Sequence, residues 1–427
     1  MLYNTENECY FWRLKQGGRT LCKEIPVSKD ISVNMTVVLT YQIKSIYIDN
    51  FKAFNEFSMD FSPMTILVGN NSSGKSSVLQ ALVFLKYCCE RTTREYLQDR
   101  GGTVEDIVTN GFAENEENKE IMEFRVVFQG TRDHDILTWE LTLLADKDQI
   151  QLCSENITYG EEKLLSYTST GGVRICCDGT KNVLSPGEYP CSQIVFLNDE
   201  NADARLLAIK KFFNETEPLD LLTPRDMRGS VRSSERTLGV SGEKLPTLIQ
   251  QLDDDEKKEL KQELRSVLPH LRDITTVTRK AGWTHLELEE AFENRTINVS
   301  SVGVSDGALR LLALFSLRFL KKSGGITLLD EIEDGISPQN IEAFLRHIRA
   351  YAQEQNQQIL LTTHSTVLLD YAQPEEIRYM FRNKDGDVVC RRFEDLNDVK
   401  EKMTYLYPGE ILLNYSDEEL IREDSDE

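Results

Sequence analysis

The sequence predicts an α/β fold with a mixed central sheet, and three observations support this prediction. Residues 64–68 form a short apolar run that ends at a glycine-rich turn, and residues 76–91 follow with apolar side chains at helical spacing. Between residues 120 and 178, apolar runs separated by Asp, Lys and Gly turns predict antiparallel strands. Residues 308–362 then return to an alternation of helix and strand, which is typical of an α/β core.

The elements of the last third follow from local signals. A helix over 308–322 is expected to end at a Gly-Gly pair, and a buried strand over 326–329 follows. Ser337 and Pro338 predict the start of another helix, and residues 358–362 predict the next strand. The final expected element is a hairpin that pairs 378–382 with 388–393.

The middle of the chain is less regular. A strand is expected to end near Leu197, and residues 201–272 look mainly helical around a loop at 223–244. Residues before Met35 show little periodicity, and Met35 offers an alternative start. The predicted parts are an N-terminal extension (1–40), a first lobe with the antiparallel insertion (41–200), a helical lobe (201–300), the second half of the α/β core (301–398) and an acidic C-terminal tail (399–427).

The composition is that of a globular protein with an acidic excess. The 427 residues include 49 Lys and Arg against 71 Asp and Glu, which gives a formal charge of −22. This balance argues against nucleic-acid binding by bulk charge. No stretch is apolar enough to span a membrane and no signal peptide is evident, so we expect a cytoplasmic protein without a membrane partner. The nine Cys include no C-x-x-C pair, which favours reduced thiols over a zinc or redox site.

The strongest motif is the glycine-rich turn itself, because GNNSSGKS at 69–76 fits the phosphate-binding pattern G-x-x-x-x-G-K-[ST] between a strand and a helix. Its backbone N–H groups and the helix N-terminus are expected to face the phosphates of ATP. Lys75 would reach the β- and γ-phosphates, and the hydroxyl of Ser76 would hold Mg²⁺. The candidate ATP-binding residues are Gly69, Asn70, Asn71, Ser72, Ser73, Gly74, Lys75, Ser76 and Ser77.

Two strand ends supply candidate catalytic groups. The strand over 326–329 delivers Asp330 and Glu331 to its carboxyl end, where ligands collect in open α/β sheets. Asp330 is placed to bind Mg²⁺, commonly through water, and Glu331 can deprotonate the water that attacks the γ-phosphate. The strand over 358–362 places His364 at a second strand end.

A fourth segment, 303–312, carries Ser305, Asp306 and Gly307 in front of a strongly apolar helix. Ser305 or Asp306 could serve as an ordinary N-cap, and a helix N-terminus is equally an anion site.

These four segments, in this order, resemble the ABC-type ATPase heads of the SMC, RecF and OLD group over about residues 41–395. GNNSSGKS resembles the Walker A loop, VSDGALR the signature motif, DEIEDGISP Walker B with the D-loop, and TTHS the His switch. The resemblance implies a β lobe and a helical lobe inserted between Walker A and the signature. It also implies ATP sandwiched in a dimer or higher oligomer, with Ser305, Asp306 and Gly307 acting in trans, His364 sensing the γ-phosphate and Asp334 at the dimer seam.

Several features of this group are missing from the chain, and their absence limits which of its members the chain can resemble. Where the group has a Q-loop glutamine as a metal ligand, this chain has LNDENAD, and Asn198 is the assigned equivalent. Coiled-coil arms and a zinc hook are missing, and too few residues follow His364 for the Toprim nuclease domain of the OLD proteins. An N-K-x-D guanine motif is also missing, which argues against a GTPase.

The leading interpretation is a stand-alone, OLD-like ABC ATPase that regulates a separately encoded effector. Chains of this architecture resemble the ATPase subunits of anti-phage systems such as PARIS and Septu, in which the effector is a nuclease. One alternative is a RecF-like repair ATPase that binds duplex DNA through a local basic patch at 205–244, which includes Arg225, Arg228, Arg232 and Arg236. A second alternative is a scaffold latched by ATP, in which hydrolysis is incidental.

Overall fold

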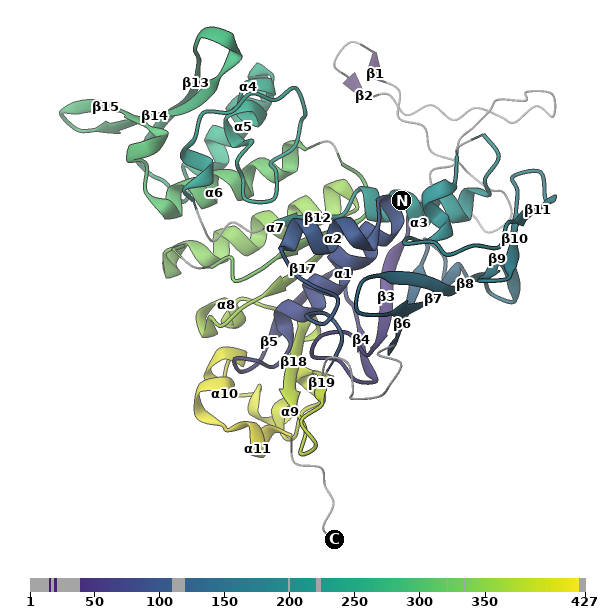
Figure 1. The fold of residues 1–427 in the computed structure, drawn as a ribbon. Helices are drawn as coiled ribbons and strands as arrows, with labels where there is room; N and C mark the ends of the chain where they lie inside the picture. The colour runs from purple at the N-terminus through teal and green to yellow at the C-terminus, as the bar shows by residue number, and fades with distance from the viewer. Residues whose placement is uncertain are drawn as a thin grey trace. The chain divides into compact units, whose positions relative to one another are not determined.

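The computed structural model describes residues 15–16, 19–20, 39–109, 120–198, 200–219, 224–320, 322–333 and 335–421. The chain divides into two units, Met1–Val38 and Leu39–Glu427. In the first unit, strands β1 (Lys15–Gln16) and β2 (Arg19–Thr20) pair antiparallel. All other described elements belong to the second unit (Figure 1). Within the described residues, no helix is both long and apolar enough to cross a membrane.

The central sheet has six strands in the order β12-β16-β17-β5-β18-β19. All neighbouring strands are parallel except the β18–β19 hairpin. Every residue of β5, β16 and β17 is buried, as expected of parallel strands covered on both faces. The strands are β5 (Met64–Val68), β12 (Glu217–Leu219), β16 (Ile326–Leu329), β17 (Gln358–Thr362), β18 (Ile377–Arg382) and β19 (Val388–Arg392). The strands and the hairpin predicted for this core are confirmed.

A second sheet has eight antiparallel strands in the order β11-β10-β9-β8-β7-β6-β3-β4. Strict alternation of buried and half-buried residues along β7 shows that one face packs on a core. The strands are β3 (Gln42–Asp49), β4 (Phe57–Asp60), β6 (Glu120–Gln129), β7 (Ile136–Ala145), β8 (Ile150–Tyr159), β9 (Glu162–Thr168), β10 (Gly171–Ile175) and β11 (Lys181–Leu184). The predicted antiparallel region is therefore confirmed.

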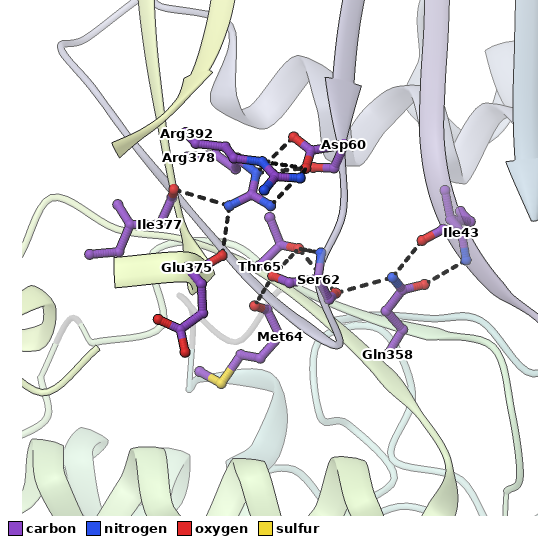
Figure 2. A network of polar contacts seen from close by, with 10 residues as sticks. All are labelled: Ile43, Asp60, Ser62, Met64, Thr65, Gln358, Glu375, Ile377, Arg378 and Arg392. Carbon is purple, nitrogen blue, oxygen red and sulfur yellow. Dashed lines mark hydrogen bonds and ion pairs between the residues drawn. The ribbon is translucent and has the colours of Figure 1, made fainter. Parts of the chain in front are cut away.

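Buried polar contacts join the two sheets, as Figure 2 shows. The amide of Gln358 on β17 accepts from the backbone N–H of Ile43 at 2.9 Å and donates to its carbonyl at 2.8 Å. The carboxylate of Asp60, at the end of β4, binds the guanidinium groups of Arg378 and Arg392 from the β18–β19 hairpin. Because Arg378 is only 2% exposed, this pair fixes the position of β4 against the central sheet.

Two predictions for the middle of the chain are wrong. Residues 271–300 of the expected helical lobe form a three-stranded antiparallel sheet, β13 (Leu271–Thr278), β14 (Thr284–Phe292) and β15 (Arg295–Ser300). In β14 and β15, apolar residues recur at the strand period of two. The strand expected to end at Leu197 is instead a 3₁₀ turn, Gln193–Phe196. The Ser192 hydroxyl caps this turn by accepting from the N–H of Ile194 at 2.9 Å.

The helices of the first half are α1 (Lys75–Glu90), α2 (Thr93–Arg100), α3 (Ala204–Asn214), α4 (Leu245–Gln251) and α5 (Asp254–Leu264). Those that follow are α6 (Asp306–Ser316), α7 (Ile341–Gln355), α8 (Thr366–Asp370), α9 (Val399–Lys402), α10 (Pro408–Asn414) and α11 (Asp417–Leu420). Shorter 3₁₀ turns lie at 226–228, 280–282, 301–303, 317–319, 338–340, 374–376 and 393–395.

The prediction of an acidic tail over 399–427 is also wrong for residues 399–421. These residues form helices α9 to α11 within the second unit. Val399, Ile411 and Leu420 are fully buried there, so apolar burial outweighs the acidic composition. Residues 422–427 lie outside the described part of the chain.

Candidate functional site

The phosphate-binding loop joins β5 to α1 and depends on glycine at two positions. Gly69 has φ 152° and lies so close to β18 that a Cβ there would be 2.0 Å from the carbonyl oxygen of Met380. Gly74 has φ 94° and precedes α1, whose N-terminus has no side-chain cap and no acidic residue in its first turn. The amide N–H groups of this helix end are therefore available to an anion.

Lys75 lies inside the loop. Its ammonium donates to the carbonyls of Gly69 at 2.8 Å and Asn70 at 3.0 Å, and the residue is 5% exposed. Burial lowers the pKa of the ammonium below its ordinary value, and the nearby carboxylates of Glu331 and Asp330 partly oppose that shift.

The two acidic residues predicted at the end of β16, Asp330 and Glu331, lie beside the start of α1. Asp330 Oδ1 accepts a hydrogen bond from the Ser76 hydroxyl at 3.3 Å and one from the Thr362 hydroxyl at 2.5 Å. Thr362 in turn accepts from the backbone N–H of Glu331 at 3.0 Å. Glu331 has φ 42°, a left-handed conformation that costs free energy in a non-glycine residue, so this hydrogen bond supports a strained position.

His364 follows β17 and faces Glu331. Its Nε2 lies 3.3 Å from Glu331 Oε1, and both side chains are 39% exposed. The structure thus brings Lys75, Ser76, Asp330, Glu331 and His364 together at one edge of the central sheet.

The candidate signature residues occupy a different place. The Ser305 hydroxyl caps α6 by accepting from the N–H of Ala308 at 3.3 Å, and Asp306 is paired with Arg228. A Cβ on Gly307 would lie 2.2 Å from the carbonyl oxygen of Gly335, so α6 begins close to Gly335, in the segment after β16. Among the described residues, no hydrogen bond or ion pair joins 305–307 to Lys75 or Ser76. Asp334, the predicted D-loop residue, lies outside the described residues.

Among the described residues, no hydrogen bond or ion pair joins Asn198 to Ser76 or Asp330. The carbonyl of Leu197 accepts from Lys210 of α3, and the N–H of Ser192 donates to the carbonyl of Cys88 in the last turn of α1. That turn lies about 20 Å along the helix from Lys75, from the helical rise per residue. The assignment of Asn198 as a metal ligand stays a prediction.

The structure also places residues at the loop that the motifs do not reveal. The Asn70 amide donates to Asp417 of α11 at 2.7 Å, and Arg382 of β18 donates to the carbonyl of Ser72 at 3.0 Å. The hydroxyl of Ser73 is buried without a partner in the described part of the chain. Asn71 is exposed, and Ser77 lies in the first turn of α1.

The oxygen atoms at the site suit Mg²⁺. Ser76 and Asp330 offer a hydroxyl and a carboxylate 3.3 Å apart, and hard oxygen ligands are those that Mg²⁺ prefers. Within the described ranges, no group of three or more His, Cys, Asp or Glu is arranged so that it could hold a metal ion by itself. The donor set therefore fits an ion whose remaining ligands come from water and nucleotide phosphates.

Comparisons with known proteins add a family and a fold. Residues 64–370 match the family described as "AAA domain, putative AbiEii toxin, Type IV TA system". A search of curated protein sequences finds no match. Among solved structures, an SMC head bound to the C-winged helix domain of ScpA is 15% identical, with a TM-score of 0.54 over 82% of this chain and 98% of that one. The SMC head domain from Thermotoga maritima is 13% identical, with a TM-score of 0.45 over the same shares.

Proposed function

The chain belongs to the family of AAA domains described above as putative AbiEii toxins, and from this premise we propose that it binds and hydrolyses ATP with Mg²⁺. Its fold is that of the SMC-head, ABC-type P-loop NTPases, as the sequence predicted. One observation carries the proposal: the hydroxyl of Ser76 lies 3.3 Å from Asp330, although the two residues are 254 positions apart in the sequence. That contact joins the phosphate-binding loop to the acidic strand end.

In the proposed reaction, Lys75 and the amide groups at the start of α1 bind the phosphates. Ser76 and Asp330 would hold Mg²⁺, which supplies charge neutralisation on the β- and γ-phosphate oxygens. Glu331 accepts the proton of the attacking water. His364 lies 3.3 Å from Glu331 and would sense the γ-phosphate.

We further propose that the competent site is formed by two subunits. Among the described residues, no hydrogen bond or ion pair joins Ser305, Asp306 or Gly307 to the phosphate-binding loop of their own chain. The N-terminus of α6 would then complete the site of a neighbouring subunit, with ATP between them. Asp334 is the proposed residue at that seam.

The proposed output is control of a separately encoded effector, a nuclease, in bacterial anti-phage defence. The family description, which names a type IV TA system, supports a role of this kind. A relative of the same fold is solved with a protein partner, the C-winged helix domain of ScpA, which supports a protein as the partner here.

The RecF-like alternative has weaker support, because four of the eight Lys and Arg residues in the basic patch at 205–244 form ion pairs with acidic residues. Arg205 pairs with Asp203 and Glu162, Arg228 with Asp306, Arg236 with Glu256, and Lys244 with Glu235. Arg225 and Arg232 remain exposed. Strong, salt-dependent binding of duplex DNA would favour this alternative. A purified chain that binds ATP without turnover would favour the scaffold.

The test of the proposed function is Glu331→Gln. We expect this variant to bind ATP, to lose turnover and to accumulate as an ATP-bound oligomer, which light scattering with and without ATP would measure. Lys75→Ala is the control, since it should abolish both ATP binding and oligomer formation. Turnover and oligomeric state unchanged by Glu331→Gln would refute the proposal.

A further inference from the structure

Glu333, two residues after Glu331, has no role in the reaction described above, yet it binds the His364 segment at three points. Its Oε1 accepts from the hydroxyl of Thr363 at 2.5 Å, from the N–H of His364 at 2.9 Å and from the N–H of Ser365 at 3.2 Å. Hydrogen bonds to a carboxylate are about twice as strong as those between neutral groups. The carboxylate therefore holds the backbone on both sides of the His364 side chain.

An ordinary helix cap does not account for these contacts. The N-terminus of α8 is already capped by Ser365, whose hydroxyl accepts from the N–H of Leu368 at 3.2 Å. Residues 363–365 are the whole connection between β17 and α8. Glu333 thus fixes this short link itself.

The turn that carries Glu333 contacts both of the elements that the proposed reaction needs. At its beginning, Glu331 lies 3.3 Å from His364. At its end, Gly335 lies against Gly307 at the start of α6. A displacement of Glu333 would therefore alter the distance between Glu331 and His364 without touching Lys75.

We propose that Glu333 is a positioning residue for hydrolysis, which holds His364 at the distance from Glu331 that the reaction requires. This inference rests on the proposed ATPase function and deepens it. A misplaced catalytic pair slows the chemical step while leaving substrate binding intact.

The first experiment is a double-mutant cycle of Glu333→Ala and His364→Ala in the full chain, with Glu342→Ala of α7 as an exposed control. Glu333→Ala should lower kcat by about tenfold or more, with KM for ATP unchanged within about threefold. In the His364→Ala background, the same substitution should cost less than about threefold, because it acts through His364. Glu333→Gln keeps an acceptor oxygen and should recover part of kcat.

The second experiment is amide hydrogen exchange without nucleotide. The N–H groups of His364 and Ser365 should exchange faster in Glu333→Ala than in wild type, while those inside α7 should not change. Additive losses of kcat, or a rise in KM that matches a fall in melting temperature, would overturn the positioning role. Absence of ATP turnover in the wild-type protein would overturn the ATPase function instead. In that case, an unchanged exchange rate at His364 in Glu333→Ala would still show that Glu333 does not hold the His364 segment.

Discussion

Thr362 is the residue on which the geometry of the two acidic side chains depends. Its hydroxyl donates to Asp330 and accepts from the N–H of Glu331, and the side chain is fully buried at the end of β17. Removing the hydroxyl would leave Asp330 free to rotate away from Ser76 and would release the strained backbone of Glu331.

Thr362→Val tests this dependence, because valine keeps the shape and removes the hydroxyl. We expect the Mg²⁺ concentration for half-maximal ATPase activity to rise about tenfold, since groups that orient metal ligands contribute on this scale. Titration of turnover with Mg²⁺ measures the effect. Thr362→Ser should stay near wild type, and an unchanged Mg²⁺ dependence in Thr362→Val would contradict the role.

Gly307 lies where no side chain fits. A Cβ there would come within 2.2 Å of the carbonyl oxygen of Gly335, so Gly307→Ala should push the start of α6 away from Gly335. Overpacking of this kind costs about 1–3 kcal/mol in the free energy of unfolding. Urea unfolding measures it. The control is Gly229→Ala, where the nearest atom would be at an ordinary 3.5 Å, and equal losses in both variants would count against the close contact.

The residues that could be read from the sequence are those in local motifs. Lys75 and Ser76 follow from the loop pattern, and Asp330, Glu331 and His364 follow from strand ends. Thr362 and Glu333 act through hydrogen bonds between segments about thirty positions apart. No pattern in a single segment reports such a contact.

At the scale of elements, β4 is held against the β18–β19 hairpin by charge (Figure 2). Burial alone would raise the pKa of the Asp60 carboxyl, but Arg378 and Arg392 outweigh that effect and hold the pKa below its ordinary value of 3.8. A lowered folded pKa means that the ionised carboxylate stabilises the folded state above the unfolded pKa. This stabilisation is lost as the pH falls through the folded value.

Asp60→Asn should therefore lower the free energy of unfolding at neutral pH by about 2 kcal/mol, a modest value because carbonyl oxygens still accept from Arg378. The difference from wild type should shrink as the pH is lowered below 3.8. Urea unfolding at several pH values measures both. Asp395→Asn, which removes an exposed ion pair with Lys400, should change little at any pH.

Helix α11 lies against the phosphate-binding loop. Asp417 accepts from Asn70 at 2.7 Å and from the buried hydroxyl of Tyr379 at 2.5 Å, and burial together with Asp417 raises the pKa of Tyr379. The acidic C-terminal segment thus brings a negative charge to the loop that is proposed to bind a triphosphate. The charge opposes ATP binding.

Asp417→Asn should therefore increase the affinity for ATP, by about threefold at low ionic strength and less at high salt. Fluorescence titration with a labelled ATP analogue at two salt concentrations measures the change. Glu418→Ala, an exposed neighbour without contact to Asn70 among the described residues, is the control. A lower affinity in Asp417→Asn would show that the hydrogen bond to Asn70 matters more than the charge.

At the scale of the whole molecule, the chain order of strands and helices was enough to predict the central sheet and the antiparallel β lobe. The β13–β15 sheet was missed because the charged helix before it, α5, extended the helical interpretation too far. The folded C-terminal segment was missed because the acids that gather after Ser416 set the interpretation of the whole segment, although residues 403–415 are mostly apolar.

If the site is formed by two subunits, two inactive variants should restore ATP turnover when they are mixed. Lys75→Ala removes the phosphate contact and Ser305→Ala removes the signature serine, so each variant alone should be inactive. If Ser305 acts in trans, a mixed dimer has one site with both defects and one intact site. Equal mixtures should then regain part of the wild-type turnover, because ATP can hold the mixed dimer together at its one intact site. If Ser305 acts on its own chain, every site keeps one defect and mixing restores no turnover.

Turnover of the mixed variants, refolded or co-expressed, distinguishes the two arrangements. The control for exchange of subunits is the double variant Lys75→Ala/Ser305→Ala mixed with wild type.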